Sequence, residues 1–214
     1  MAVALEQAER VGWDGVRLHR VAAALDIPLA EIYRHYRDAD AIAEAWLSKA
    51  DRAMLAQQEP DFARLPPAQR IERVMLQWLD ALAPHRAVTR QMLLGKLYPG
   101  HPHFVASLIL RLSRTVQWLR EAALLQAGPP RRQLEEIALT WLFVATVGVW
   151  AVDRSEGQQT TRRFLANRLR NAQRLGQFCP AAALQRMRGQ PPAAPIATGI
   201  ARRRSQRRRA SSAR

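Results

Sequence analysis

The stretch from residue 12 to residue 46, GWDGVRLHRVAAALDIPLAEIYRHYRDADAIAEAW, decides the fold. Apolar side chains recur at intervals of three and four over about residues 16–25, which predicts a helix. Asp26 follows, and aspartate tolerates the left-handed backbone that a tight turn between helices needs. Pro28 suits the first turn of a short third helix that ends near Tyr36. Two short helices and a tight turn before a longer helix predict a helix-turn-helix unit.

The rest of the chain also has the pattern of helices, because no segment alternates apolar and polar residues in the manner of a strand. Asp38 suits the N-cap of the fourth helix. Further helices are expected at about residues 2–11, 68–83, 85–97, 103–126, 131–152 and up to 175. The predicted fold class is all-α, with a three-helix domain over residues 1–50 and a second helical domain over residues 51–175.

The helix expected at residues 131–152 contains sixteen consecutive uncharged residues, from Ile137 to Val152. Sixteen is fewer than the roughly 20 apolar residues that a membrane-spanning helix needs. A helix that is apolar on every face is expected to be buried, either in the core or in a subunit interface.

The charge of the chain is unevenly distributed. The 214 residues are 48% hydrophobic, which is typical of a globular protein, and their formal net charge is +15. Nine arginines and no acid lie in residues 176–214, while residues 1–50 hold six basic and eight acidic side chains. Residues 176–214 are expected to form a disordered tail, which either contacts polyanions such as nucleic acid or an anionic membrane surface, or is only solvated.

Cysteine usage and the start of the chain bear on the compartment. Cys179 is the only cysteine, and the first residues lack the features of a signal peptide. We therefore expect a cytoplasmic protein.

The helix-turn-helix stretch resembles the TetR family of transcriptional regulators. The residues that carry the resemblance are Gly12, Trp13, Leu18, Val21, Ala22 and Ile27, the segment Ile32 to Tyr36, and Ile42. The resemblance implies a homodimer that binds operator DNA through its N-terminal helices. It also implies a C-terminal domain that dimerises and binds a hydrophobic small molecule.

The resemblance implies which residues contact DNA. Tyr33, His35 and Arg17 match positions that contact phosphates in the family, and nearby arginines add charge that releases counterions. The full set expected at the DNA is Arg17, His19, Tyr33, Arg34, His35, Tyr36 and Arg37.

Four positions depart from the family pattern. In the turn, Asp26 replaces a glycine and Pro28 replaces a serine. Glu31 replaces a hydroxyl residue that faces DNA, and Ala39 replaces a lysine that binds the backbone. A carboxylate is repelled by phosphate, and the first fifty residues are slightly acidic. The alternative interpretation is that the apolar residues of this unit form only a packed core.

A second resemblance supports an alternative function. The region from Leu139 through Trp150 and Asp153 to Leu169 resembles a lipid-binding family of ubiquinone biosynthesis that is related to the TetR fold. That family does not bind DNA and uses an apolar C-terminal cavity for isoprenoid lipids. The alternative is therefore a lipid-binding accessory protein of ubiquinone biosynthesis.

Large apolar side chains of the C-terminal domain are candidates for lining a ligand pocket, because such sites are mostly apolar. The candidates are Trp78, Met92, Leu93, Leu97, Trp118, Trp141, Phe143 and Trp150. The alternative is that they form only the core and a dimer interface.

Enzymatic chemistry is not expected. His101 and His103 flank a proline in a turn without the spacing of metal ligands, and the chain has neither a phosphate-binding glycine loop nor a nucleophile elbow. We therefore expect no catalytic residues, no metal and no cofactor.

Overall fold

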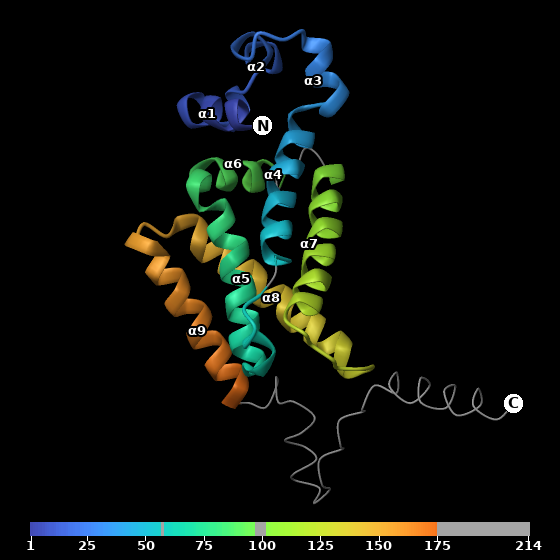
Figure 1. The fold of residues 1–214 in the computed structure, drawn as a ribbon, viewed down its shortest axis with the longest axis vertical. Coiled ribbons are helices and arrows are strands. Elements are labelled where there is room, and N and C mark those ends of the chain that lie inside the picture. The colour runs from blue at the N-terminus through green and yellow to red at the C-terminus, as the bar shows by residue number, and fades with distance from the viewer. Residues whose placement is uncertain (57, 97–101, 175–214) are drawn as a thin grey trace, which may run out of the picture. The chain divides into compact units, whose positions relative to one another are not determined.

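The computed structural model describes residues 1–56, 58–96 and 102–174, and it describes only the backbone for residues 102–107. Every regular element in these ranges is a helix (Figure 1), which confirms the all-α fold class. The α-helices are α1 (Ala2–Val11), α2 (Leu18–Ala24), α3 (Leu29–His35), α4 (Ala39–Met54), α5 (Pro67–Leu82), α6 (Arg86–Lys96), α7 (Pro102–Ala122), α8 (Arg131–Val152) and α9 (Gln159–Arg174). The predictions for Leu97, His101, Cys179 and the tail from residue 176 lie outside the described residues.

Local sequence signals account for several helix ends. The Oδ1 atom of Asp38 accepts a hydrogen bond from the backbone N–H of Ala41 at 2.7 Å, so Asp38 is the N-cap of α4 as predicted. Helix α5 begins at Pro67, where a missing backbone N–H leaves no hydrogen bond unmade. Helix α8 has the predicted bounds, Arg131–Val152.

The core of the C-terminal domain joins α4, α5, α6 and α8. The indole N–H of buried Trp46 on α4 donates to the hydroxyl of Thr89 on α6 at 2.8 Å. The ring of Trp78 on α5 packs edge-to-face against Phe143 on α8, with 4.9 Å between the ring centroids. Because the polar end of Trp46 has a buried partner, its large apolar surface can be buried without an unsatisfied donor.

The N-terminal helices are tied to the rest of the chain through α4 and through the start of α6. The backbone N–H of Trp13, in a short 3-10 turn after α1, donates to Oε1 of Gln91 on α6 at 2.6 Å. The Nδ1 atom of His85, just before α6, lies 2.6 Å from Oε1 of Glu9 on α1. The described residues up to 174 belong to one compact unit, and a functional division near residue 50 stays a prediction.

Helix α8 buries one face and exposes the other. Leu139, Phe143 and Trp150 are buried, whereas an apolar stripe on the opposite side is exposed, consisting of Leu134, Ile137, Trp141 and Val144. By length and composition alone α8 could cross a membrane, and 28% of its most apolar window is buried within the chain. We expected α8 to be buried on every face. Within this chain only one of its faces is buried.

Candidate functional site

The turn between α2 and α3 has the conformation that the sequence predicts. Asp26 has a φ of 54°, in the left-handed region, and the N–H of Ile27 donates to the carbonyl of Ala22 at 3.1 Å. This tight turn joins α2 and α3 into a helix-turn-helix unit, which lies at the top of the molecule in Figure 1. Aspartate thus performs the role of the glycine that is usual in the resembling family.

Helix α3 has one packed face and one exposed face. Ile32 is buried in the core and Tyr36 packs against that core, while the side chain of Tyr33 is exposed, with 66% of the residue accessible to solvent. Arg34 and His35 are also exposed. An exposed large aromatic on a short helix that is anchored from behind is available to contact a partner.

Glu31 pairs with two of the predicted DNA-binding side chains. Its Oε2 atom accepts a hydrogen bond from Nη1 of Arg34 at 2.9 Å, and its Oε1 atom lies 3.3 Å from Nε2 of His35. These three residues are spaced three and four apart on α3, the separations that bring side chains together on a helix. The positive charge at this end of α3 is therefore partly neutralised by its own helix.

The remaining predicted DNA-binding residues flank α3. Nη1 of Arg17 donates to the carbonyls of Asp14 and Val16, at 2.8 and 3.0 Å, just before α2 begins. His19 on α2 and Arg37 after α3 are exposed. All predicted residues except Tyr36 are thus on the surface of the N-terminal unit.

A partly buried ionic network lies between α4, α6 and α7. The Nζ atom of Lys96, buried on α6, is 2.6 Å from Oδ1 of Asp40 and 2.9 Å from Oε1 of Glu44, both on α4. Arg111 of α7 donates to Glu44 and to Asp51, which is 2.9 Å away. The sequence analysis missed this network, although the spacing of the three acids along α4 was a signal for it.

The network shifts the ionisation of its members. Burial alone would raise the pKa of Glu44, but the hydrogen bond from Lys96 and the charge of Arg111 outweigh burial and lower that pKa. Burial would lower the pKa of Lys96, but its bonds to Asp40 and Glu44 raise that pKa above the usual value. Both ends of the network therefore stay charged around neutral pH.

The predicted pocket residues in the described part of the chain are divided between the core and the surface. Trp78, Met92, Phe143 and Trp150 are buried in the core, and Leu93 packs against it. Trp118 and Trp141 are exposed, on α7 and α8. Their role as a ligand site stays a prediction, and five of the eight contribute to the core or pack against it.

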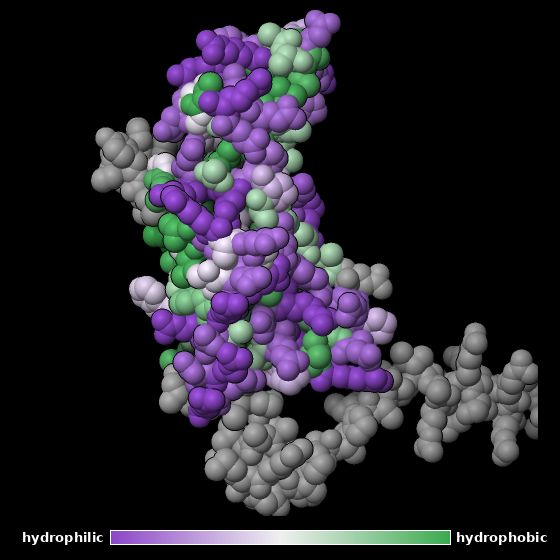
Figure 2. Space-filling view, turned by 90° about the vertical axis from the view of Figure 1, so that its left-hand side faces the viewer, coloured by the Kyte–Doolittle hydropathy of each residue, from purple (hydrophilic) through white to green (hydrophobic). Residues whose placement is uncertain are grey.

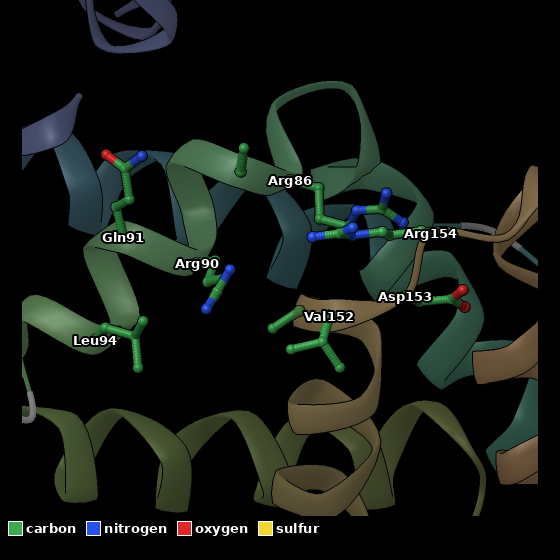
Figure 3. Close-up of a pocket in the computed structure, with 9 residues that line it drawn as sticks. Arg86, Arg90, Gln91, Leu94, Val152, Asp153 and Arg154 are labelled. Carbon is green, nitrogen blue, oxygen red and sulfur yellow. The ribbon is translucent and has the colours of Figure 1, made fainter. Parts of the chain in front are cut away.

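A pocket of about 530 Å³ lies instead between α6 and the end of α8 (Figure 3). Its walls carry three arginines, Arg86, Arg90 and Arg154, together with Gln91 and Asp153, and aliphatic side chains that include Leu94 and Val152. Burial alone would raise the pKa of Asp153, but hydrogen bonds from Ser155 and Thr161 hold it well below the usual range. The sequence analysis did not single out this pocket.

Among the described residues no group of three or more His, Cys, Asp or Glu side chains could hold a metal ion.

In Figure 2 most of the surface in view is hydrophilic, and apolar residues gather along one edge at mid-height.

Comparison with known proteins identifies the family of the chain. No model of a protein family matches the chain, and no curated protein matches it. Among solved structures it is similar to the TetR transcriptional regulator from Nitrosomonas europaea ATCC 19718, with 39% sequence identity and a TM-score of 0.71. The match covers 80% of this chain and 94% of that one, and it gives no support to the lipid-binding alternative. The chain belongs to the TetR family of transcriptional regulators.

Proposed function

We propose that this protein is a homodimeric, operator-binding regulator in which α3 reads DNA and a small molecule bound to the C-terminal domain modulates that binding. The observation that carries the proposal is the geometry of α3, where Ile32 and Tyr36 anchor the helix while Tyr33 is exposed. A recognition helix needs this division, because its inner face must be held rigidly while its outer face enters the major groove.

The exposed side chains fit contacts to the DNA backbone. The phenol of Tyr33 can donate a hydrogen bond to a phosphate, and the guanidinium groups of Arg34 and Arg37 add charge. Glu31 opposes binding, because its pairs with Arg34 and His35 must open before either side chain can reach DNA. We therefore expect weak binding to random DNA and a larger difference between operator and random sequence.

The exposed apolar stripe of α8, defined above as Leu134, Ile137, Trp141 and Val144, supports the homodimer. Trp141 alone is 72% exposed. A contiguous apolar stripe of this kind is unfavourable in water and marks a protein interface. A second copy that presents the same helix would cover it symmetrically, which is the usual arrangement of dimers.

The test is a fluorescence anisotropy titration with two labelled duplexes of equal length, the DNA upstream of the protein's own gene and a scrambled version, at several salt concentrations. Selective binding of the upstream duplex is expected. Tyr33→Ala should weaken binding about tenfold, and Leu110→Ala, which removes an exposed apolar side chain on α7, should leave it unchanged.

Equal affinity for both duplexes would refute the proposal. A second refuting outcome comes from the double substitution Glu31→Thr and Ala39→Lys. If the wild type binds no duplex and the double variant binds strongly, the native surface is not a DNA reader.

A further inference from the structure

The pocket between α6 and the end of α8 has an excess of positive charge that nothing in the described chain neutralises. Its three arginines, Arg86, Arg90 and Arg154, have no ion pair or hydrogen bond among the described residues. In Figure 3 Arg86 and Arg154 extend toward the same end of the pocket, and Arg90 projects from α6. Like charges held close in a concave site raise the local potential and attract an anion.

The single acid of the pocket is not available to these arginines. Asp153 is buried, and its two oxygens accept bonds from the N–H and hydroxyl groups of Ser155 and Thr161, at 2.6 to 2.9 Å. These hydrogen bonds hold the carboxylate against the loop that leads into α9, and in Figure 3 it points away from the cavity. Among the residues that the structure describes, the side chains of these arginines therefore have no counter-ion.

The opposite part of the wall is aliphatic and exposed. Leu94 on α6 is 53% exposed and Val152 at the end of α8 is 62% exposed, and both line the cavity. Exposed aliphatic groups gain free energy when apolar surface covers them. A free inorganic anion would satisfy the arginines and leave these two side chains in water.

We infer that this pocket binds an amphipathic organic anion, whose carboxylate or phosphate head pairs with the arginines and whose alkyl chain covers Leu94 and Val152. A volume of about 530 Å³ suits such a molecule, because small-molecule sites usually enclose several hundred Å³. Planar guanidinium groups bind carboxylate and phosphate oxygens in pairs, which gives the head a defined orientation.

The pocket is connected to the DNA-binding unit by a direct contact. Gln91 lines the pocket and also accepts the hydrogen bond from the backbone N–H of Trp13, at 2.6 Å. Next to Arg86, His85 contacts Glu9 of α1. A ligand that pulls α6 toward α8 would therefore change the support of α1. This regulatory role rests on the proposed function, whereas the binding site itself does not.

The experiment is calorimetric titration of the full chain with four probes, kept below the concentrations at which they aggregate. Octanoate and octyl phosphate carry both head and chain, 1-octanol lacks the charge, and acetate lacks the chain. We expect octanoate or octyl phosphate to bind once per chain, and 1-octanol and acetate to bind at least about tenfold more weakly. The two anionic probes distinguish a carboxylate ligand from a phosphate ligand.

Variants locate the site. The double variant Arg90→Gln and Arg154→Gln changes two exposed side chains, so the fold should persist, and it should weaken binding of the anionic probe at least about tenfold. The matched control, Arg52→Gln with Arg114→Gln, removes the same charge from exposed positions outside the pocket and should change nothing. Leu94→Ser should weaken the binding of octanoate but not that of acetate.

Three results would overturn the inference. The first is that neither octanoate nor octyl phosphate binds more tightly than 1-octanol. The second is that the Arg90 and Arg154 double variant binds the tighter of these two anionic probes as well as the wild type does. The third is that this variant loses binding to random DNA while it still binds that probe. The last would assign the arginines to a DNA backbone. Because calorimetry needs no DNA, binding of octanoate or octyl phosphate without selective DNA binding refutes the proposed function and leaves the site intact. Selective DNA binding without binding of either anionic probe does the reverse.

Discussion

Replacing Lys96 by methionine tests whether the ionic network between α4, α6 and α7 stabilises the fold. Methionine has a side chain of similar length but no charge. The substitution therefore removes the ammonium group that lies 2.6 Å from Asp40 and 2.9 Å from Glu44. Removing one partner of a fully buried charge pair costs about 3–5 kcal/mol.

The expected cost is smaller here. The side chains of Asp40 and Glu44 are each 35% exposed, so water partly replaces the lost ammonium, and Arg111 remains beside Glu44. We expect the free energy of unfolding to fall by about 2 kcal/mol. For a chain of this size that corresponds to a decrease in Tm of about 4–8 °C.

The assay is equilibrium unfolding in urea, followed by circular dichroism at several pH values. The lowered pKa of Glu44 means that its contribution is present above the unfolded pKa of 4.5 and is lost as the pH falls through the lower folded value. The raised pKa of Lys96 means that its contribution is present below 10.5 and is lost as the pH rises through the higher folded value. Lys96→Met should abolish the decrease in the free energy of unfolding at alkaline pH and make the decrease at acidic pH smaller.

The matched control is Lys49→Met, at the only other lysine of the chain. Lys49 is exposed and its Nζ atom lies 5.1 Å from the ring centroid of Trp46, so the control should cost less than about 1 kcal/mol. If Lys96→Met is no less stable than Lys49→Met, the network does not stabilise the fold and the reasoning fails.

Three further outcomes are expected. Asp26→Val should lower the free energy of unfolding by about 1–2 kcal/mol in urea titrations, because a β-branched side chain is strained at a φ of 54°, whereas Asp26→Gly should stay within about 0.5 kcal/mol of the wild type. Asp153→Asn should destabilise the chain by about 1–3 kcal/mol at pH 7, because the amide has only one acceptor oxygen for the N–H and hydroxyl donors of Ser155 and Thr161. Since the pKa of Asp153 is lowered, the difference from the wild type should shrink only as the pH falls below the ordinary value of 3.8. If the proposed homodimer forms through α8, Trp141→Glu should convert it into monomers in sedimentation velocity with little change in helicity, and an unchanged mass would count against α8 as the interface.

Features encoded within a few residues could be predicted from the sequence. The N-cap at Asp38 and the left-handed turn at Asp26 depend on local backbone chemistry, and both occur as expected. The pairing of Glu31 with Arg34 and His35 also follows from helical spacing. It could therefore have been predicted from the sequence, although it was not.

Features that depend on tertiary packing could not be predicted in the same way. Arg86 and Arg90 meet Arg154 only because α6 packs against the end of α8. Similarly, periodicity identified Trp141 and Trp150 as apolar positions of one helix, but nine residues along α8 place them on different faces, so one is exposed and the other buried. Which face is covered depends on the neighbouring helices.

In the proposed complex with DNA, the carboxylate of Glu31 would restrict which bases α3 can recognise. In the major groove a carboxylate can accept a hydrogen bond from the amino group of cytosine, while a guanidinium pairs with the acceptors of guanine. In the proposed complex a C·G base pair could therefore take the place of the Glu31–Arg34 pair that closes in its absence. At a site without such a base pair the Glu31–Arg34 pair would stay closed and neither side chain would gain a partner in the DNA, so the same two side chains would favour operators with a C·G base pair at that position.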